Sequence, residues 1–333
     1  MTGAFKNSKP QVMSKTDQWG IDIEVARRQP DADILKGKIM MFEGFESRFV
    51  DVSDGQIFCR LGGEGPPLLL LHGNPQTHVM WHKCAHALAE NYQLVIADLR
   101  GYGDSLVVDS DPEHFNYSKR KMAQDMAEVM TALGHDRFFV AGHDRGGRVA
   151  HRLARDHRDR VAALSVLDIC PTLEMYEATD MDFATAYFHW FFLIQPYDLP
   201  ERMILEDPYK WMDACLQKWS GGHEFGEAEH AYLKAFDDPK RIHACCEDYR
   251  AAATIDLDHD RADRDQKLNI PLQVLWGAKG VVGRKFKPID VWQDYTTGNV
   301  VGRGMPTGHF IPEEDPEGTI AELTGFFDPL PRP

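Results

Sequence analysis

The stretch that most constrains this chain is residues 138–152, where a short apolar run leads through Gly142-His143-Asp144-Arg145-Gly146 into a helical pattern. This order predicts a strand joined to a helix by a turn so tight that only very small residues fit two positions to either side of its centre. Gly142 and Gly146 occupy those positions. Such a turn holds its central side chain out at the carboxyl end of the strand, so the sequence singles out Asp144.

An aspartate at the centre of this turn, where serine is more familiar, predicts a particular chemistry. A carboxyl group with a reference pKa of about 3.9 is ionised at neutral pH, so it attacks carbon without needing a base. Its natural target is an sp3 carbon with a leaving group, and water activated by a histidine must then hydrolyse the ester on Asp144. The turn therefore predicts a covalent hydrolase of carbon–halogen bonds or epoxides. Glycine and aspartate also fill ordinary turns, but the flanking strand and helix favour the catalytic interpretation.

The composition excludes several classes of protein. The chain has 333 residues, of which 43% are hydrophobic, enough for one α/β domain with an insertion. A net charge of -15 argues against nucleic-acid partners, and no apolar stretch reaches the length of about 18 residues that a membrane span needs. The cysteines form no Cys-x-x-Cys pair and follow no secretory signal pattern, so we expect free thiols and a cytoplasmic location. A homodimer is compatible with the sequence, which does not fix the number of chains.

The pattern along the chain predicts an α/β fold with a mostly parallel, doubly wound sheet. Residues 1–40 are polar and patternless and are expected to form an N-terminal extension. Residues 41–170 and 261–333 form the predicted core, whereas residues 171–260 read as helical and aromatic-rich, and we expect them to form an inserted cap. The predicted strands are 48–52, 55–60, 67–72, 93–98, 138–141, 161–168 and 272–277, and a helix is predicted at 119–133.

Two further residues complete a catalytic set with Asp144. His309, in Thr307-Gly308-His309, lies late in the chain on a predicted loop, which is where a base above the sheet is expected. A base of this kind needs a carboxylate on its far ring nitrogen, and Asp168 ends a strand at the same carboxyl edge as Asp144. Asp256, Asp258 and Asp260 are weaker competitors, since they are bunched in what we expect to be a polar loop.

The groups around the nucleophile indicate how the reaction and its substrate are stabilised. The backbone N–H groups of Arg145 and Asn74 are predicted to form an oxyanion hole for ester hydrolysis. Arg145 and Arg148 lie within one turn of Asp144. In a closed pocket two unpaired guanidinium groups would be costly, unless an anion meets them. A substrate carboxylate would satisfy both, which favours a small 2-halo acid.

In this order the residues resemble the haloacetate and fluoroacetate dehalogenases of the α/β-hydrolase superfamily. The resemblance extends from about Phe42 to Phe327 and implies an α/β-hydrolase fold with hydrolysis of haloacetate to glycolate and halide. It rests on short motifs that are highly specific when taken together: His72-Gly73-Asn74-Pro75-Gln76, Asp98-Leu99-Arg100-Gly101-Tyr102-Gly103, Gly142-His143-Asp144-Arg145-Gly146-Gly147-Arg148, Val166-Leu167-Asp168-Ile169, Tyr187-Phe188-His189-Trp190, Asp248-Tyr249-Arg250-Ala251 and Gly308-His309-Phe310.

The resemblance also assigns roles to individual residues. It implies that Asp144 is the nucleophile, His309 the water-activating base and Asp168 the group that orients this base. It implies that Arg145 and Arg148 hold the substrate carboxylate. No cofactor or metal ion is implied by this scheme.

The departing halide is assigned a pocket of its own by the same resemblance. His189, Trp190 and Tyr249 are implied to stabilise the halide, and Trp219 looks like the residue that closes the pocket. Imidazole, indole and phenol donors aimed at one point would suit fluoride, which concentrates its charge. The structural alternative for this aromatic stretch is the packed face of a cap helix.

Asn74 departs from the pattern, since many fluoroacetate enzymes carry an aromatic residue after His-Gly. Asparagine there resembles the haloalkane dehalogenases, and it puts the preference for fluoride in doubt while leaving the chemistry in place. An epoxide hydrolase is the nearest alternative enzyme, although two cap tyrosines are not evident beyond Tyr249. A non-catalytic ligand receptor on the same fold is a further alternative, which the presence of Asp144, Asp168 and His309 disfavours.

Overall fold

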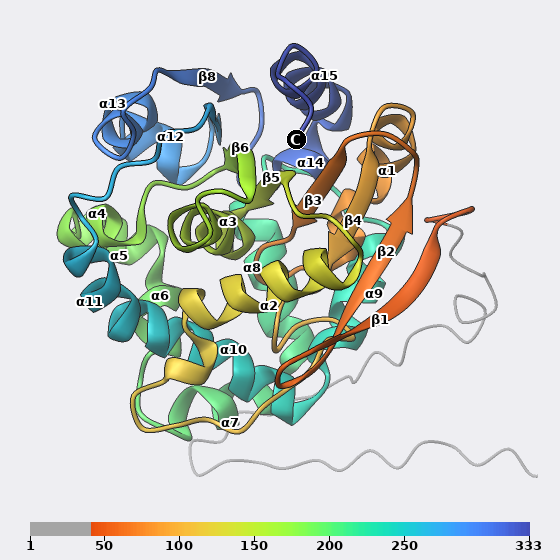
Figure 1. The fold of residues 1–333 in the computed structure, drawn as a ribbon. Coiled ribbons are helices and arrows are strands. Elements are labelled where there is room, and N and C mark those ends of the chain that lie inside the picture. The colour runs from red at the N-terminus through yellow and green to blue at the C-terminus, as the bar shows by residue number, and fades with distance from the viewer. Residues whose placement is uncertain (1–40) are drawn as a thin grey trace, which may run out of the picture. The chain divides into compact units, whose positions relative to one another are not determined.

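The structure, a computed structural model, describes residues 41–333, so the predicted N-terminal extension at residues 1–40 lies outside the described residues. Its centre is an eight-stranded sheet in the order β1-β2-β4-β3-β5-β6-β7-β8 (Figure 1). Only β2 runs against the direction of the other strands. The strands are β1 Glu46–Val52, β2 Gly55–Gly62, β3 Pro67–Leu71, β4 Gln93–Ala97, β5 Phe138–His143, β6 Val161–Leu167, β7 Leu272–Gly277 and β8 Val300–Met305.

The two faces of the sheet are covered by different helices, because side chains alternate between the faces along each strand. In β3, Leu68 and Leu70 pack with residues of α1 and α15, whereas Leu69 and Leu71 pack with residues of α2 and α3. All four leucines are fully buried, as expected for a strand between two helical layers. The helices of the core are α1 His82–Ala89, α2 Lys119–Ala132, α3 Asp144–Asp156, α12 Val281–Lys285, α13 Pro288–Gln293, α14 Ile311–Glu314 and α15 Pro316–Phe327, with 3-10 turns η2 His78–Trp81 and η3 Phe115–Tyr117.

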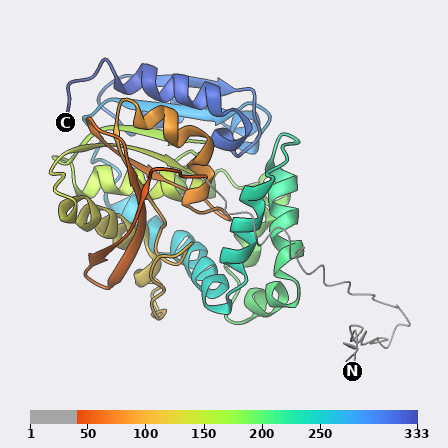
Figure 2. The ribbon, with the colours of Figure 1, turned by 90° about the vertical axis from the view of Figure 1, so that its right-hand side faces the viewer.

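A series of helices separates β6 from β7, and Figure 2 shows most of it gathered in green to teal beside the sheet. The residue at which we expected the cap to end, position 260, lies inside the last of these helices. They are α4 Thr172–Glu177, α5 Met181–Ala186, α6 Phe188–Leu193, α7 Leu199–Glu206, α8 Pro208–Trp219, α9 Glu227–Phe236, α10 Pro239–Ala253 and α11 Ile255–Ala262.

The predicted α/β fold with a mostly parallel sheet is confirmed, and every predicted strand is present within a few residues. Two local expectations are wrong. Asp256, Asp258 and Asp260 lie on α11 rather than in a loop, since residues 255–262 form a short α-helix directly after α10. The edge strand β8 was not predicted, because Gly302 and Gly304 interrupt its apolar pattern and only one of its six residues is buried.

Three simple properties of residues 41–333 bear on function. No helix in this range has the length and apolar character needed to cross a bilayer. The same residues contain no cluster of three or more His, Cys, Asp or Glu side chains arranged to hold a metal ion. All six cysteines of the chain lie in this range, and each is a buried free thiol.

Candidate active site

The turn between β5 and α3 has the geometry that the sequence predicts. Asp144 has a φ of 44°, a left-handed conformation that a non-glycine residue adopts only when its surroundings impose it. A Cβ atom on Gly142 would lie 2.4 Å from the carbonyl oxygen of Gly146, and one on Gly146 would lie 2.4 Å from that of His72. The glycines are therefore required for the close approach of strand, helix and neighbouring loop, which together fix the position of Asp144.

The carboxylate of Asp144 is buried and ionised. Its Oδ2 accepts a hydrogen bond of 3.0 Å from the backbone N–H of Asn74, one of the two predicted oxyanion donors. Burial alone would raise the pKa of Asp144, but the charges of His309, Arg148 and Arg145 outweigh this effect and hold it at about 2. The group is thus an anion at neutral pH that a backbone donor orients, as a nucleophile requires.

His309 and Asp168 meet as the sequence predicts. The His309 Nδ1–H donates to Asp168 Oδ2 over 2.6 Å, and Asp168 Oδ1 accepts from the backbone N–H of Gly277 over 2.9 Å. Burial opposes the charged imidazole, but its hydrogen bond to Asp168 and the charges of Asp168 and Asp144 raise the pKa of His309 above its usual value. The tautomer that this bond fixes leaves Nε2 free to accept a proton from water.

His143, the residue before Asp144, supports the loop of His309 and was not singled out by the sequence. Its Nε2–H donates to the carbonyl oxygen of His309 over 2.7 Å, and the two rings lie 4.6 Å apart. Burial lowers the pKa of His143 to about 3, so the ring is a neutral donor at working pH. In the sequence, the signal that could have pointed to His143 is its place between Gly142 and Asp144 in the motif.

Arg145 corrects one expectation, because it is not an unpaired guanidinium group. Its Nε and Nη2 donate to the two oxygens of Asp248 over 2.8 and 2.6 Å, and its guanidinium lies 4.2 Å above the ring of Tyr249. Asp248 belongs to the motif Asp248-Tyr249-Arg250-Ala251, in which a role was predicted only for Tyr249. Only Nη1 of Arg145 is buried without a partner among the described residues, so one end of the group is left for a ligand.

Arg148 is the less satisfied of the two arginines. Its Nη1 donates to the carbonyl oxygen of Cys170 and to Thr172 Oγ1, and its guanidinium lies 4.8 Å above the ring of Trp190. Within residues 41–333 no carboxylate forms an ion pair with it, and its Nε has no partner. Burial accordingly lowers the pKa of Arg148, although Asp144 opposes the shift. A buried cation next to Asp144 is therefore not neutralised by direct pairing.

The aromatic residues predicted for the halide pocket gather from three helices. His189 on α6 lies 4.2 Å from the ring of Trp219 on α8 and 5.7 Å from that of Tyr249 on α10. Burial lowers the pKa of His189 well below its usual value, with Asp144 opposing this, so the ring is neutral. His189 Nδ1 and Trp219 Nε1 are buried without partners among the described residues. The structure thus brings polar ring atoms together that an incoming group could satisfy.

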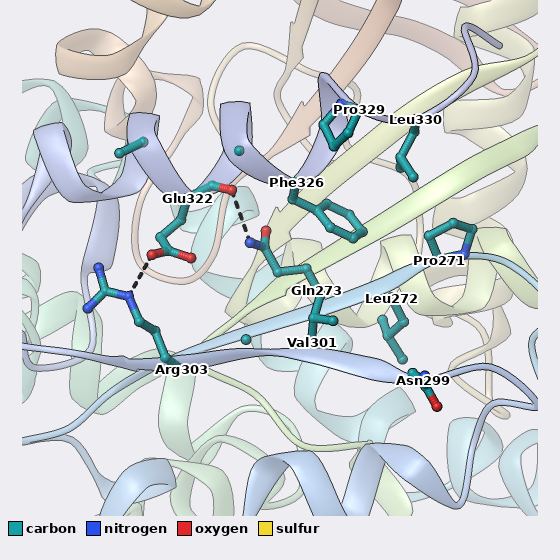
Figure 3. A pocket seen from close by; sticks show the side chains of 13 residues that line it. Pro271, Leu272, Gln273, Asn299, Val301, Arg303, Glu322, Phe326, Pro329 and Leu330 are labelled. Carbon is teal, nitrogen blue, oxygen red and sulfur yellow. Dashed lines mark hydrogen bonds and ion pairs between the residues drawn. The ribbon is translucent and has the colours of Figure 1, made fainter.

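Asp144 and His309 lie in a closed site, each about 6% exposed. A groove of about 610 Å³ lies elsewhere, between the β7–β8 edge and α15 (Figure 3). It is lined by residues such as Gln273, Val301 and Phe326, and none of the predicted site residues contributes to it. The groove is therefore separate from Asp144, Asp168 and His309.

Comparisons with known proteins identify related sequences and structures. A family profile described as alpha/beta hydrolase fold matches residues 66–316. A fluoroacetate dehalogenase from Burkholderia sp. is 45% identical over 289 residues, covering 86% of this chain and 95% of that protein. A soluble epoxide hydrolase from Corynebacterium sp. (strain C12) is 34% identical over 274 residues, covering 80% and 92% respectively.

A solved structure from Nostoc sp. PCC 7120, provisionally described as an α/β hydrolase, is 53% identical with a TM-score of 0.83. The match covers 85% of this chain and 98% of that one. Identity at this level over nearly the whole of each relative, together with the family profile, establishes the relationship. The chain therefore belongs to the haloacetate dehalogenase family within the α/β-hydrolase superfamily.

Proposed function

We propose that this protein hydrolyses small 2-halo carboxylic acids to 2-hydroxy acids and halide through an ester on Asp144. The observation that carries the proposal is Arg148, a buried guanidinium group beside an anionic nucleophile with no carboxylate partner in residues 41–333. A substrate carboxylate would supply the missing charge partner. A relative that is named a fluoroacetate dehalogenase supports the same substrate class.

The proposed reaction has two steps. A carboxylate oxygen of Asp144 attacks the carbon that bears the halogen, and the halide leaves with the electron pair of the broken bond. His309 then takes a proton from water, whose oxygen attacks the ester carbonyl carbon, while the N–H groups of Asn74 and Arg145 receive the developing oxyanion. The ester C–O bond then breaks, the departing alkoxide takes the proton from His309 to form the 2-hydroxy acid, and the carboxyl group of Asp144 loses its proton to solvent and is restored as a carboxylate. Residues 171–260, which carry α4–α10 and most of α11, act as the cap that closes the site above these groups.

Epoxide hydrolysis is the second candidate, and two tyrosines favour it. Beside Tyr249, Tyr187 is buried near the nucleophile, although the sequence did not single it out. Burial, and then nearby carboxylates that include Asp144, raise the pKa of both phenols well above its usual value, so both remain O–H donors. Such donors could protonate an epoxide oxygen. Arg148 argues against a neutral substrate, because its charge would stay unpaired.

The experiment that separates these functions is a substrate panel on the purified protein. Free halide is measured with fluoroacetate, chloroacetate and bromoacetate, and diol formation is measured with styrene oxide in parallel. We expect halide release with at least one haloacetate. The kcat/KM for styrene oxide should be at least about 100-fold lower than the kcat/KM for that haloacetate, because a neutral epoxide leaves a buried charge unpaired. Efficient diol formation without halide release would move the assignment to epoxide hydrolysis.

Arg148→Leu should weaken the recognition of the substrate carboxylate while leaving the nucleophile in place. A charge-assisted hydrogen bond contributes about 1.5–3 kcal/mol, so kcat/KM for chloroacetate should fall by roughly 10- to 150-fold. Neutral chloroacetamide should lose much less. Equal losses on the two substrates would mean that Arg148 supports the turn through Thr172 and Cys170 and does not bind the carboxylate.

Tyr249→Phe tests the halide pocket, because it deletes one hydroxyl and keeps the ring that packs on Arg145. Fluoride concentrates its charge most and needs the donor most, whereas bromide leaves readily without it. We expect defluorination to fall by one to two orders of magnitude, roughly the value of one strong hydrogen bond, and debromination by only a few-fold. A uniform loss across the halides would assign Tyr249 to substrate positioning instead.

A further inference from the structure

Arg145 and Arg148, the two arginines proposed to hold the substrate carboxylate, are called the arginine clamp here. A third buried cation lies behind them, and the sequence did not single it out. Lys119, the first residue of α2, is only 3% exposed, and its Nζ contacts Asp248 Oδ1, the oxygen that also accepts from Arg145 Nη2. The same Nζ lies 3.6 Å from Asp256 Oδ2, and the backbone N–H of Lys119 donates to Asp256 Oδ1 over 2.9 Å. Lys119 therefore lies between two buried carboxylates, one of which holds Arg145.

The carboxylate of Asp248 is fully used by these contacts. Its Oδ2 accepts from Arg145 Nε and from the hydroxyl of Tyr102 over 2.7 Å, while its Oδ1 accepts from both cations. If Arg145 were its only charged partner, the pair would be neutral and would attract an anion weakly. Since Lys119 shares Asp248, part of the charge of Arg145 remains available at its unpartnered Nη1.

Lys119 also faces the second arginine of the clamp. A small closed chamber behind Arg148 is lined by both residues and by Asp256 and Asp260, among others. Asp260 forms ion pairs with Arg152 and Arg155, which lie further along α3 than Arg148. Lys119 is thus the cation that lies against both Asp248 and Asp256. Burying a charged lysine away from water costs free energy. We therefore look to the interactions of its charge to explain why Lys119 is buried so close to Arg145 and Arg148.

We propose that Lys119 is a positioning residue for anionic substrates. Its single positive charge offsets one of the two negative charges of Asp248 and Asp256, so that Lys119, Arg145 and Arg148 together present a net positive charge to a bound carboxylate. The inference rests on the proposed function, because it concerns the same substrate group. The competing explanation is purely structural, with Lys119 anchoring the first turn of α2 to α10 and α11. Charge and anchoring predict different responses to neutral substrates and to compensating variants.

The central variant is Lys119→Met, which removes the charge and keeps most of the length of the side chain. We expect KM for chloroacetate to rise by about tenfold, the order expected for losing one nearby charge in a partly desolvated site, with kcat changed less than about twofold. Chloroacetamide should be unaffected. Lys121→Met is the matched control, since Lys121 lies on the same helix but pairs with Asp54 at the surface, and it should leave both substrates unchanged.

A compensating variant separates charge from anchoring and keeps the test valid if Lys119→Met does not fold. Lys119→Met/Asp256→Asn removes one positive and one negative charge together, so the charge facing the clamp is restored. We expect its KM for chloroacetate to return to within about threefold of the wild-type value, and Lys119→Arg to stay there throughout. A KM that stays high in the double variant, or equal losses on chloroacetate and chloroacetamide, would overturn the proposal.

Binding of acetate, an unreactive carboxylate, gives a readout that does not depend on dehalogenation. Quenching of tryptophan fluorescence by acetate should report a Kd for wild type that Lys119→Met raises by about tenfold and the double variant restores. If wild type releases no halide but shows this pattern, the proposed function fails and the role of Lys119 stands. If halide is released while acetate binds equally to all variants, the role of Lys119 is wrong.

Discussion

Replacing Asp144 with asparagine should reduce halide release by at least about three orders of magnitude, the scale expected when a covalent nucleophile is removed. The amide keeps the size and the left-handed backbone position of the aspartate but offers a neutral, far poorer nucleophile. The loss should appear with every haloacetate, because attack precedes all dependence on the leaving group. It should leave acetate binding largely intact, since the arginines are unchanged.

The measurement is halide release under single-turnover conditions, with intact mass checked so that conversion of the new asparagine back to aspartate is excluded. Asp258→Asn serves as the control for the same chemical change, because Asp258 is exposed on α11 and forms only a surface pair with Arg261. It should keep wild-type activity. An Asp144→Asn protein of verified mass that retained more than a tenth of the wild-type rate would remove Asp144 from the role of nucleophile.

The positions of Asp144, Asp168 and His309 could be predicted from sequence because short-range rules determine them. The glycines around Asp144 are needed wherever a strand turns into a helix so tightly, and parallel neighbouring strands bring Asp144 and Asp168 to one edge of the sheet. The fold class followed from the same alternation of apolar runs and helical patterns. His309 followed from its late loop with a glycine before it.

The partners of the arginines could not be predicted in the same way. Lys119 and Asp248 are 129 positions apart in sequence, and they meet because η3 contacts both α2 and α10. Nothing local in the sequence states that Arg145 already has a carboxylate partner. The strand β8 was missed for another reason, since an exposed, glycine-containing edge strand lacks the apolar alternation that identifies buried strands.

Replacing His309 with asparagine should stop the second step and leave the first. Attack by Asp144 needs no base, so chloroacetate should give one burst of halide of at most one equivalent per active site. Steady-state turnover should fall by at least about three orders of magnitude, since no other base takes the proton from water. The Asp144 peptide should carry a stable carboxymethyl ester, detected by mass spectrometry. A burst without this adduct would contradict the two-step scheme.

The pH dependence of the wild-type enzyme should also distinguish the free enzyme from the ester intermediate. In the free enzyme the charge of Asp144 helps to raise the pKa of His309, against the effect of burial. Once Asp144 is esterified that charge is gone, so the pKa of His309 must fall and the neutral base becomes available at lower pH. Ester hydrolysis should therefore be lost as pH falls through a pKa lower than that of His309 in the free enzyme. Histidine titration by NMR gives the free value and rapid-quench single turnover gives the ester value; a higher pKa for the ester form would rule out His309 as its base.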